Sequence, residues 1–285
     1  MKVDFLIIGA QKCGTTTLFD ILKRHPALDA SRTKEPHFFS KATDWRRELD
    51  RYHGLFAGRE GALHFEASTT YTFFPQMKRT IVDDIYAYNP KMKFIYIVRD
   101  PMERVVSGYI HSYERGHTEM SLEQAVSQDQ GLLDVSRYYT QISPFIRKFG
   151  RERVLILDFD DLTSDVDALL DQIAGFLGID AAAFPERRIR SNAAVDFPRY
   201  HHRLDSPSLA LRFLRRLFPP LWRLYARSST RRLGKRPKLT PAARQMIRRE
   251  LEPEMKEVGK LMGKDLSKWL QLSERVDSDR AAPPC

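Results

Sequence analysis

Short apolar runs followed by amphipathic stretches organise the first part of this chain. Residues 3–8 are apolar apart from one aspartate, which is typical of a buried strand. A glycine-containing loop follows, and then Leu18, Ile21 and Leu22 recur at helical spacing on one face. This helix must stop before Pro26. The chain is therefore expected to open with a strand, a loop and a helix.

The same order of elements recurs further along the chain. Residues 93–98 form an apolar strand that leads through a short polar loop into a helix over about 102–113. A third strand is predicted at 153–158, preceded by a helix near 138–149 and followed by one near 166–177. Apolar strands separated by helices predict an α/β protein with a central parallel sheet that is flanked by helices.

The last third of the chain has a different pattern. Residues 201–240 are rich in arginine and interrupted by prolines, and they predict a basic, helical, lid-like segment. A regular helix follows over about 241–262, and residues 276–285 predict a disordered tail. At 285 residues with 42% hydrophobic content, the chain is long enough for one large domain, which we expect to span residues 1–275.

Positive charge is concentrated in that basic segment. The chain has 47 Lys and Arg against 37 Asp and Glu, which gives a net charge of +10. Residues 201–240 contain 11 of the basic residues and one acidic residue, so they account for the whole excess. A solvated lid, peripheral contact with an anionic membrane, and steering of an anionic substrate all fit this composition.

Cysteine content and hydropathy bear on the cellular compartment. The two cysteines, Cys13 and Cys285, form no disulfide framework, which fits a reducing cytoplasm. The apolar start of the chain is too short for a signal peptide, and no stretch approaches 18 apolar residues. We therefore expect a soluble, cytoplasmic protein.

The loop after the first strand has the composition of an anion-binding site. Backbone N–H groups and the N-terminus of the next helix would surround a concave space. Gly14 lets the backbone approach a ligand closely, and Lys12 supplies a mobile positive charge. The hydroxyls of Thr15, Thr16 and Thr17 add donors. Because no lysine follows Gly14, the loop departs from the Walker A pattern, and ATP hydrolysis is disfavoured.

A second anion site is predicted where the strand at 93–98 ends. Arg99 gives a forked, permanently charged donor, and Ser107 adds a hydroxyl from the second turn of the next helix. Arg104 in the same helix is interpreted as a surface or helix-packing residue in preference to a direct nucleotide contact, and Tyr109 as a core-packing residue. If the first and second strands are neighbours in the sheet, the two sites can hold both ends of one nucleotide.

Together these motifs resemble those of the sulfotransferases that use 3′-phosphoadenosine 5′-phosphosulfate (PAPS), most of all the heparan sulfate type, in a soluble, bacterial-like form. The resemblance implies a P-loop NTPase-like sulfotransferase fold and no metal. It implies transfer of a sulfuryl group from PAPS to a hydroxyl or amine of a carbohydrate, glycolipid or other small acceptor, with release of 3′-phosphoadenosine 5′-phosphate (PAP). In the family, the first loop holds the phosphosulfate and the second site holds the 3′-phosphate. The nucleotide-binding residues implied in this way are Lys12, Cys13, Gly14, Thr15, Thr16, Thr17, Arg99, Ser107, Lys235 and Arg236.

The same resemblance implies a catalytic base. The stretch from Lys34 to Phe39 is similar to the family element that carries a catalytic glutamate, which makes Glu35 the base, with Lys12 as the catalytic cation. His37 is a competing base and an expected acceptor contact. Glu66 and Tyr71 belong to a further family element and are also expected to contact the acceptor, with a simple structural role as the alternative.

One position departs from the family pattern. Ala67 stands where the family has a lysine, so either Lys12 works without that lysine, or a residue such as Lys34 or Arg32 replaces it. The departure leaves open which acceptor is used, and whether oxygen or nitrogen is sulfated.

Two other functions remain as alternatives. A nucleotide kinase or other P-loop phosphotransferase would require magnesium, for which the acidic residues at 158–161 are the candidates. A basic nucleic-acid-binding protein is less favoured, because the basic residues form no recognisable nucleic-acid module and both anion sites would be unexplained. The expected partners are therefore PAPS and a small acceptor, without nucleic acid.

Overall fold

The structure is a computed structural model, and it describes residues 1–76, 80–185 and 236–270. The strands are β1 (Phe5–Gly9), β2 (Leu28–Ala30), β3 (Leu63–Ala67), β4 (Lys93–Val98) and β5 (Val154–Asp158). The helices are α1 (Thr15–Leu22), α2 (Phe38–Lys41), α3 (Leu49–His53), α4 (Ile81–Tyr88), α5 (Pro101–Glu114), α6 (Leu122–Gln128), α7 (Gln130–Asp134), α8 (Tyr138–Phe149), α9 (Phe159–Ser164), α10 (Val166–Leu177) and α13 (Pro241–Met262). Short 3₁₀ turns lie at Thr69–Thr72, Arg151–Arg153, Ala181–Ala183 and Ser267–Leu270.

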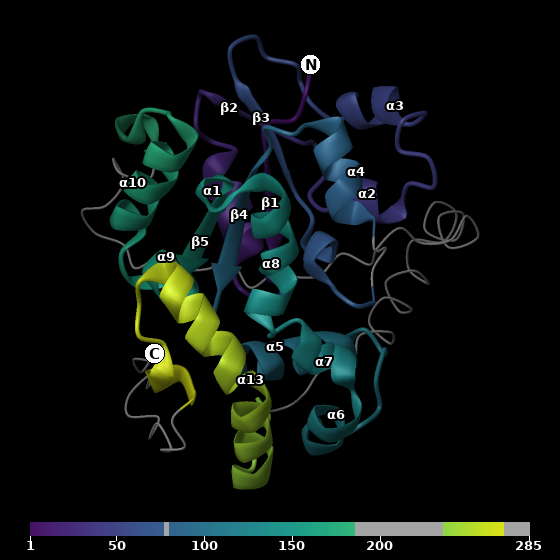
Figure 1. Ribbon diagram of the computed structural model, residues 1–285, viewed down its shortest axis with the longest axis vertical. Coiled ribbons are helices and arrows are strands. Elements are labelled where there is room, and N and C mark those ends of the chain that lie inside the picture. Colours follow the sequence, from purple (N-terminus) through teal and green to yellow (C-terminus); the bar gives the residue numbers. More distant parts are fainter. Residues whose placement is uncertain (77–79, 186–235, 271–285) are drawn as a thin grey trace, which may run out of the picture.

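The five strands form one parallel sheet in the order β2-β3-β1-β4-β5. All five residues of the central strand β1 are buried, because helices surround the sheet (Figure 1). This arrangement explains why the strands read as continuous apolar runs rather than as an alternating pattern. The predicted α/β architecture with a central parallel sheet is confirmed.

The two strands that lead into the predicted anion sites are neighbours. Phe5 of β1 aligns with Lys93 of β4, and Ile7 aligns with Ile95. Parallel strands end at the same edge of a sheet, so the loops after β1 and β4 meet there. The N–H of Ala10 in the first loop donates to a β4 carbonyl, at 2.9 Å. The two predicted anion sites therefore follow neighbouring strands, as binding both ends of one nucleotide requires.

Several short elements had no signal in the sequence pattern. The three-residue strand β2 pairs only with β3, at the edge of the sheet. The helices α2, α3, α6, α7 and α9 are each seven residues or shorter. A helix of seven residues has about two turns, and a strand of three residues has fewer than two periods, so neither leaves a clear hydrophobic pattern. Tertiary packing decides the conformation of such short elements. The longer helices α8, α10 and α13 have the predicted bounds.

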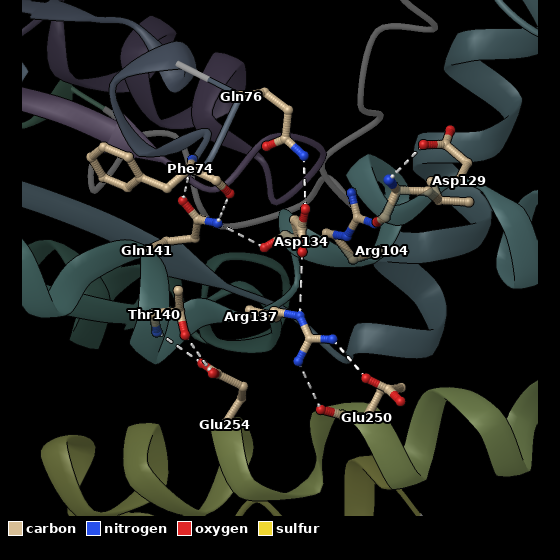
Figure 2. Close-up of polar contacts among 11 residues, drawn as sticks. Phe74, Gln76, Arg104, Asp129, Asp134, Arg137, Thr140, Gln141, Glu250 and Glu254 are labelled. Carbon is tan, nitrogen blue, oxygen red and sulfur yellow. Dashed lines mark hydrogen bonds and ion pairs between the residues drawn. The ribbon is translucent and has the colours of Figure 1, made fainter. Parts of the chain in front are cut away.

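Polar contacts hold helix α13 against α8 and against Arg137, the residue that directly precedes α8. A guanidinium nitrogen of Arg137 lies 2.7 Å from a carboxylate oxygen of Glu250 (Figure 2). The Thr140 hydroxyl donates to Glu254 at 2.6 Å (Figure 2). Leu251 on the same helix is fully buried. The chain that follows the undescribed residues 186–235 thus packs on the same core.

One hydrophobic cluster contains buried residues from Val3 to Leu270. The single domain over residues 1–275 stays a prediction, since residues 186–235 and the stretch after 270 lie outside the described residues. Most of the lid-like segment at 201–240 and the whole tail at 276–285 lie there too. Within the described ranges, no helix combines the length and the apolar character that crossing a bilayer requires.

A carboxylate lies inside this core. The Glu66 side chain is in β3 with 0% exposure, and its Oε1 accepts hydrogen bonds from the hydroxyls of Tyr71 (2.6 Å) and Tyr52 (3.4 Å). Burial raises the pKa of Glu66 to about 7. The hydrogen bonds from the two tyrosines favour the charged carboxylate and lower its pKa, but they offset only part of the increase that burial causes. Glu66 therefore changes its protonation close to neutral pH.

We expect the substitution Glu66→Gln to alter how stability depends on pH. Because the pKa is raised in the folded state, the stabilisation from protonated Glu66 is complete below the ordinary pKa of 4.5 and is lost as the pH rises to about 7. The free energy of unfolding of the variant, relative to wild type, should rise by on the order of 2–3 kcal/mol over that window. Urea unfolding of both proteins at several pH values measures this difference. A constant difference from pH 4.5 to 7 would contradict the assignment.

Candidate active site

The loop between β1 and α1 has the geometry of an anion site. Helix α1 begins at Thr15 after Gly14, which has no side chain to cap the first N–H groups of the helix. Lys12 has a φ angle of 71° and Gly14 one of 86°, and the left-handed conformation is strained for a lysine. Cys13 is buried between them, as a free thiol. Helix N–H groups are thus available to a ligand beside Lys12.

Lys12 lies among other positive charges. Burial is the main reason that the pKa of Lys12 is lowered from its ordinary value, and Glu114 opposes this effect. Arg115, Arg99 and Arg104 lower the pKa further. Such an excess of positive charge in a partly buried site favours an anion with more than one charge, such as a phosphate or phosphosulfate.

Arg99 directly follows β4 and connects the two predicted sites. Its Nη1 donates to the backbone carbonyl of Lys12 at 3.4 Å, and its guanidinium lies 4.5 Å from the ring centre of Phe159. Its own backbone carbonyl accepts a hydrogen bond from the Tyr138 hydroxyl at 2.8 Å. The side chain is 18% exposed, so it is held in place and still reachable from solvent.

Helix α5 carries the rest of the second site. Arg104 is 1% exposed, and its guanidinium donates to the Ser136 hydroxyl and the Leu132 carbonyl. Its predicted packing role is therefore confirmed, and so is that of Tyr109, which is 4% exposed. Ser107 is half-buried on the same helix, two turns after Arg99.

Glu35 and His37 lie in a strained turn beside the end of β3. Their φ angles are 59° and 55°, in the left-handed region that residues with a Cβ seldom adopt. The N–H of Glu35 donates to the Ala67 carbonyl at 2.8 Å, and that of His37 to the Ser68 hydroxyl at 2.9 Å. Since β3 pairs with β1, this turn is at the same edge of the sheet as the first anion loop.

The Glu35 carboxylate contacts three polar side chains. Lys34 Nζ donates to its Oε1 at 2.9 Å, and the Thr69 hydroxyl donates to its Oε2 at 3.3 Å. His37 Nε2 lies 3.6 Å from the same Oε2. Lys34, a candidate to replace the lysine that is missing at Ala67, is thus directly beside Glu35. The Glu35 side chain is 30% exposed, so its oriented carboxylate can meet an acceptor.

The remaining predicted site residues differ in how they relate to these two clusters. Glu66 and Tyr71 are both 0% exposed and bonded to each other, so the structure does not bring them to an acceptor. Lys235 lies outside the described residues. Arg236 is described, and its Nη2 lies 2.6 Å from Glu103 Oε2.

The acidic residues at the end of β5 have structural contacts. Asp158 accepts a hydrogen bond from the N–H of Asp160 at 2.9 Å and caps helix α9. Lys264 Nζ lies 3.6 Å from Asp158 and 2.6 Å from Asp161. A lysine ammonium and a helix N-terminus therefore neutralise these carboxylates, which does not favour the magnesium site of a P-loop phosphotransferase.

Three residues of these clusters were missed by the sequence prediction. Glu103 follows Arg99 by four positions, a spacing that predicts a helical ion pair and could have found it. Thr69 lies between Glu66 and Tyr71 in the sequence, but nothing in the sequence links its hydroxyl to Glu35. Phe159 contacts Arg99 through the adjacency of β4 and β5, for which a single sequence has no signal.

Comparisons with known proteins agree with the motifs. A family model described as sulfotransferase domain matches residues 2–205. Mouse heparan sulfate glucosamine 3-O-sulfotransferase 3A1 is 29% identical over 184 residues, which cover 61% of this chain and 45% of that protein. Mouse carbohydrate sulfotransferase 15 is 25% identical over 243 residues, covering 61% of this chain and 43% of that protein. The chain thus spans less than half the length of these curated relatives.

A solved structure of a sulfotransferase from Alicyclobacillus acidocaldarius has the same fold. The TM-score is 0.67 at 22% sequence identity, and the match covers 95% of this chain and 100% of that one. The predicted P-loop-like sulfotransferase fold is therefore confirmed. Since the family model covers well over half of the sequence, the chain belongs to the sulfotransferase domain family.

Proposed function

We propose that this protein transfers the sulfuryl group of PAPS to a hydroxyl or amine of a carbohydrate, glycolipid or other small acceptor and releases PAP. One observation carries the proposal: two cationic sites follow the neighbouring strands β1 and β4, and Arg99 of one donates to the Lys12 carbonyl of the other. A nucleotide with phosphates at both ends suits such a pair of sites. We propose a reducing cytoplasm as the compartment, which the free, buried thiol of Cys13 supports.

In this proposal the two sites divide the donor between them. PAPS supplies an activated sulfuryl group when it is bound. The N–H groups and hydroxyls at residues 13–17, with Lys12, hold the 5′-phosphosulfate, and Lys12 stabilises the negative charge that develops on the bridging oxygen. Arg99 and Ser107 hold the 3′-phosphate by charge-assisted hydrogen bonds, and Lys235 and Arg236 are added to this site.

Glu35 is proposed to act as the general base. Its carboxylate takes the proton from the acceptor hydroxyl while the acceptor oxygen bonds to sulfur and the bond from sulfur to the bridging oxygen breaks. The contacts with Lys34, Thr69 and His37 support this role, because they fix the direction of the carboxylate. His37 is proposed to face the acceptor. Strain at Glu35 and His37 is consistent with a functional turn.

The similar proteins indicate which class of acceptor this chain would use. Those named above are sulfotransferases of glucosamine in heparan sulfate and of carbohydrate, so we propose a carbohydrate hydroxyl as the first choice. Glu66 and Tyr71 are proposed to support the acceptor site from the core, rather than through contact. Lys34 then provides the cation that Ala67 cannot.

Transfer from radiolabelled PAPS tests the reaction directly. The purified protein should move label to a carbohydrate acceptor more readily than to a phenol, and PAP should accumulate in equal amount. Thermal shift with nucleotides is the control for donor identity. Stabilisation by ATP with magnesium, together with no stabilisation by PAP, would contradict the proposal.

The substitution Glu35→Gln should remove the base and leave donor binding intact. We expect turnover to fall by about 10²–10⁴-fold, with PAP affinity within about twofold of wild type. Glu48→Gln is the matched control, because Glu48 pairs with Arg51 at the surface; this variant should keep full activity. Equal turnover of Glu35→Gln and wild type would exclude Glu35 as the base.

The substitution Arg99→Ala should weaken PAP binding by about 10–100-fold, since it removes charge-assisted hydrogen bonds to the 3′-phosphate. Adenosine 5′-monophosphate (AMP), which lacks that phosphate, should lose much less affinity. Calorimetric titration of both nucleotides separates the two effects. An equal loss for AMP and PAP would show that Arg99 acts through the loop at Lys12 instead.

A further inference from the structure

Glu103 joins two cations that the proposed function assigns to the 3′-phosphate. Its Oε2 lies 3.3 Å from Arg99 Nη2 and 2.6 Å from Arg236 Nη2. Arg99 directly follows β4, whereas Arg236 belongs to the segment that leads into α13, so the two guanidinium groups come from distant parts of the sequence. Two guanidinium groups on one carboxylate oxygen form an arrangement that suits an anion.

The spacing along α5 puts Glu103 in the middle of this site. Glu103 and Ser107 are four residues apart on one side of α5, and Arg99 lies four residues before Glu103, where the chain enters the helix. A phosphate held by Arg99 and Ser107 would therefore meet the Glu103 carboxylate. Two anions cannot share the same guanidinium groups without strong repulsion.

The exposure of the three side chains allows one anion to replace the other. Glu103 is 47% exposed and Arg236 is 53% exposed, so both can turn towards solvent without disturbing the core. Arg99 is 18% exposed and stays anchored by the Lys12 carbonyl and the Phe159 ring. The exchange needs only a rotation of the Glu103 side chain.

We propose that Glu103 is an internal counterion of the 3′-phosphate site: it occupies Arg99 and Arg236 in the free protein and is displaced when the phosphate binds. This inference rests on the proposed function. Glu103 then lowers the affinity for any nucleotide that carries a 3′-phosphate and leaves other nucleotides unaffected. Because PAP carries that phosphate, the same competition speeds release of the product.

The substitution Glu103→Gln tests the proposal, since it keeps the length of the side chain and removes its charge. Calorimetric titration should show PAP binding about 5–20-fold tighter than in wild type, with AMP within about twofold. Glu252→Gln is the matched control: it removes an equal charge from an exposed helical ion pair with Arg248, and it should leave both affinities unchanged. Weaker or unchanged PAP binding in Glu103→Gln would overturn the proposal, as would an equal gain for AMP or the same gain in Glu252→Gln.

A double-mutant cycle with Arg236→Ala identifies the partner. If Glu103 competes through Arg236, the gain from Glu103→Gln should shrink to less than half when Arg236 is absent. An undiminished gain would remove Arg236 from the proposal. If the wild-type protein binds PAP no better than AMP, the proposed function itself is contradicted. If the wild-type protein prefers PAP but Glu103→Gln binds PAP no more tightly, only the role of Glu103 is contradicted.

Discussion

Positive charge held away from water at the ends of β1 and β4 is the constraint on which the rest of the site depends. Arg104 is fully buried against the neutral Ser136 hydroxyl and a backbone carbonyl, and the pKa of Lys12 is lowered chiefly by burial. Cations in such surroundings are stable only when anions compensate them. The sheet order brings Lys12 and Arg99 into contact, so one multiply charged ligand can satisfy both. Until it binds, Glu103 is the carboxylate that balances Arg99.

The acceptor side of the site depends on the core in a different way. The strained turn with Glu35 and His37 is held by groups at the end of β3, including the Ser68 hydroxyl. The Tyr71 hydroxyl accepts a hydrogen bond from the N–H of Phe39 at 3.3 Å and donates to Glu66. The Tyr71 hydroxyl thus links the buried carboxylate to the first helical residues after the turn. Glu66 and Tyr71 therefore support the segment that follows Glu35 and His37 from within the core.

Periodicity and loop chemistry predicted the parallel sheet, the long helices and the two anion loops, because each of these has a local signature of several residues. The adjacency of β1 and β4 could only be stated as a condition, since strand order is decided by packing across the whole sheet. The burial of Glu66 was not predicted for the same reason: a single carboxylate in an apolar strand does not reveal which face the core covers. The pairing of Glu103 with Arg236 joins residues far apart in sequence, which no motif connects.

A crystal structure with PAP bound would show whether the two ends of the nucleotide are divided between the ends of β1 and β4. We expect the 5′-phosphate in the loop at residues 12–17 and the 3′-phosphate within hydrogen-bond distance of Arg99 and Ser107, with Glu103 turned away from Arg99. A nucleotide bound in the opposite orientation, or a 3′-phosphate that contacts neither Arg99 nor Ser107, would contradict it.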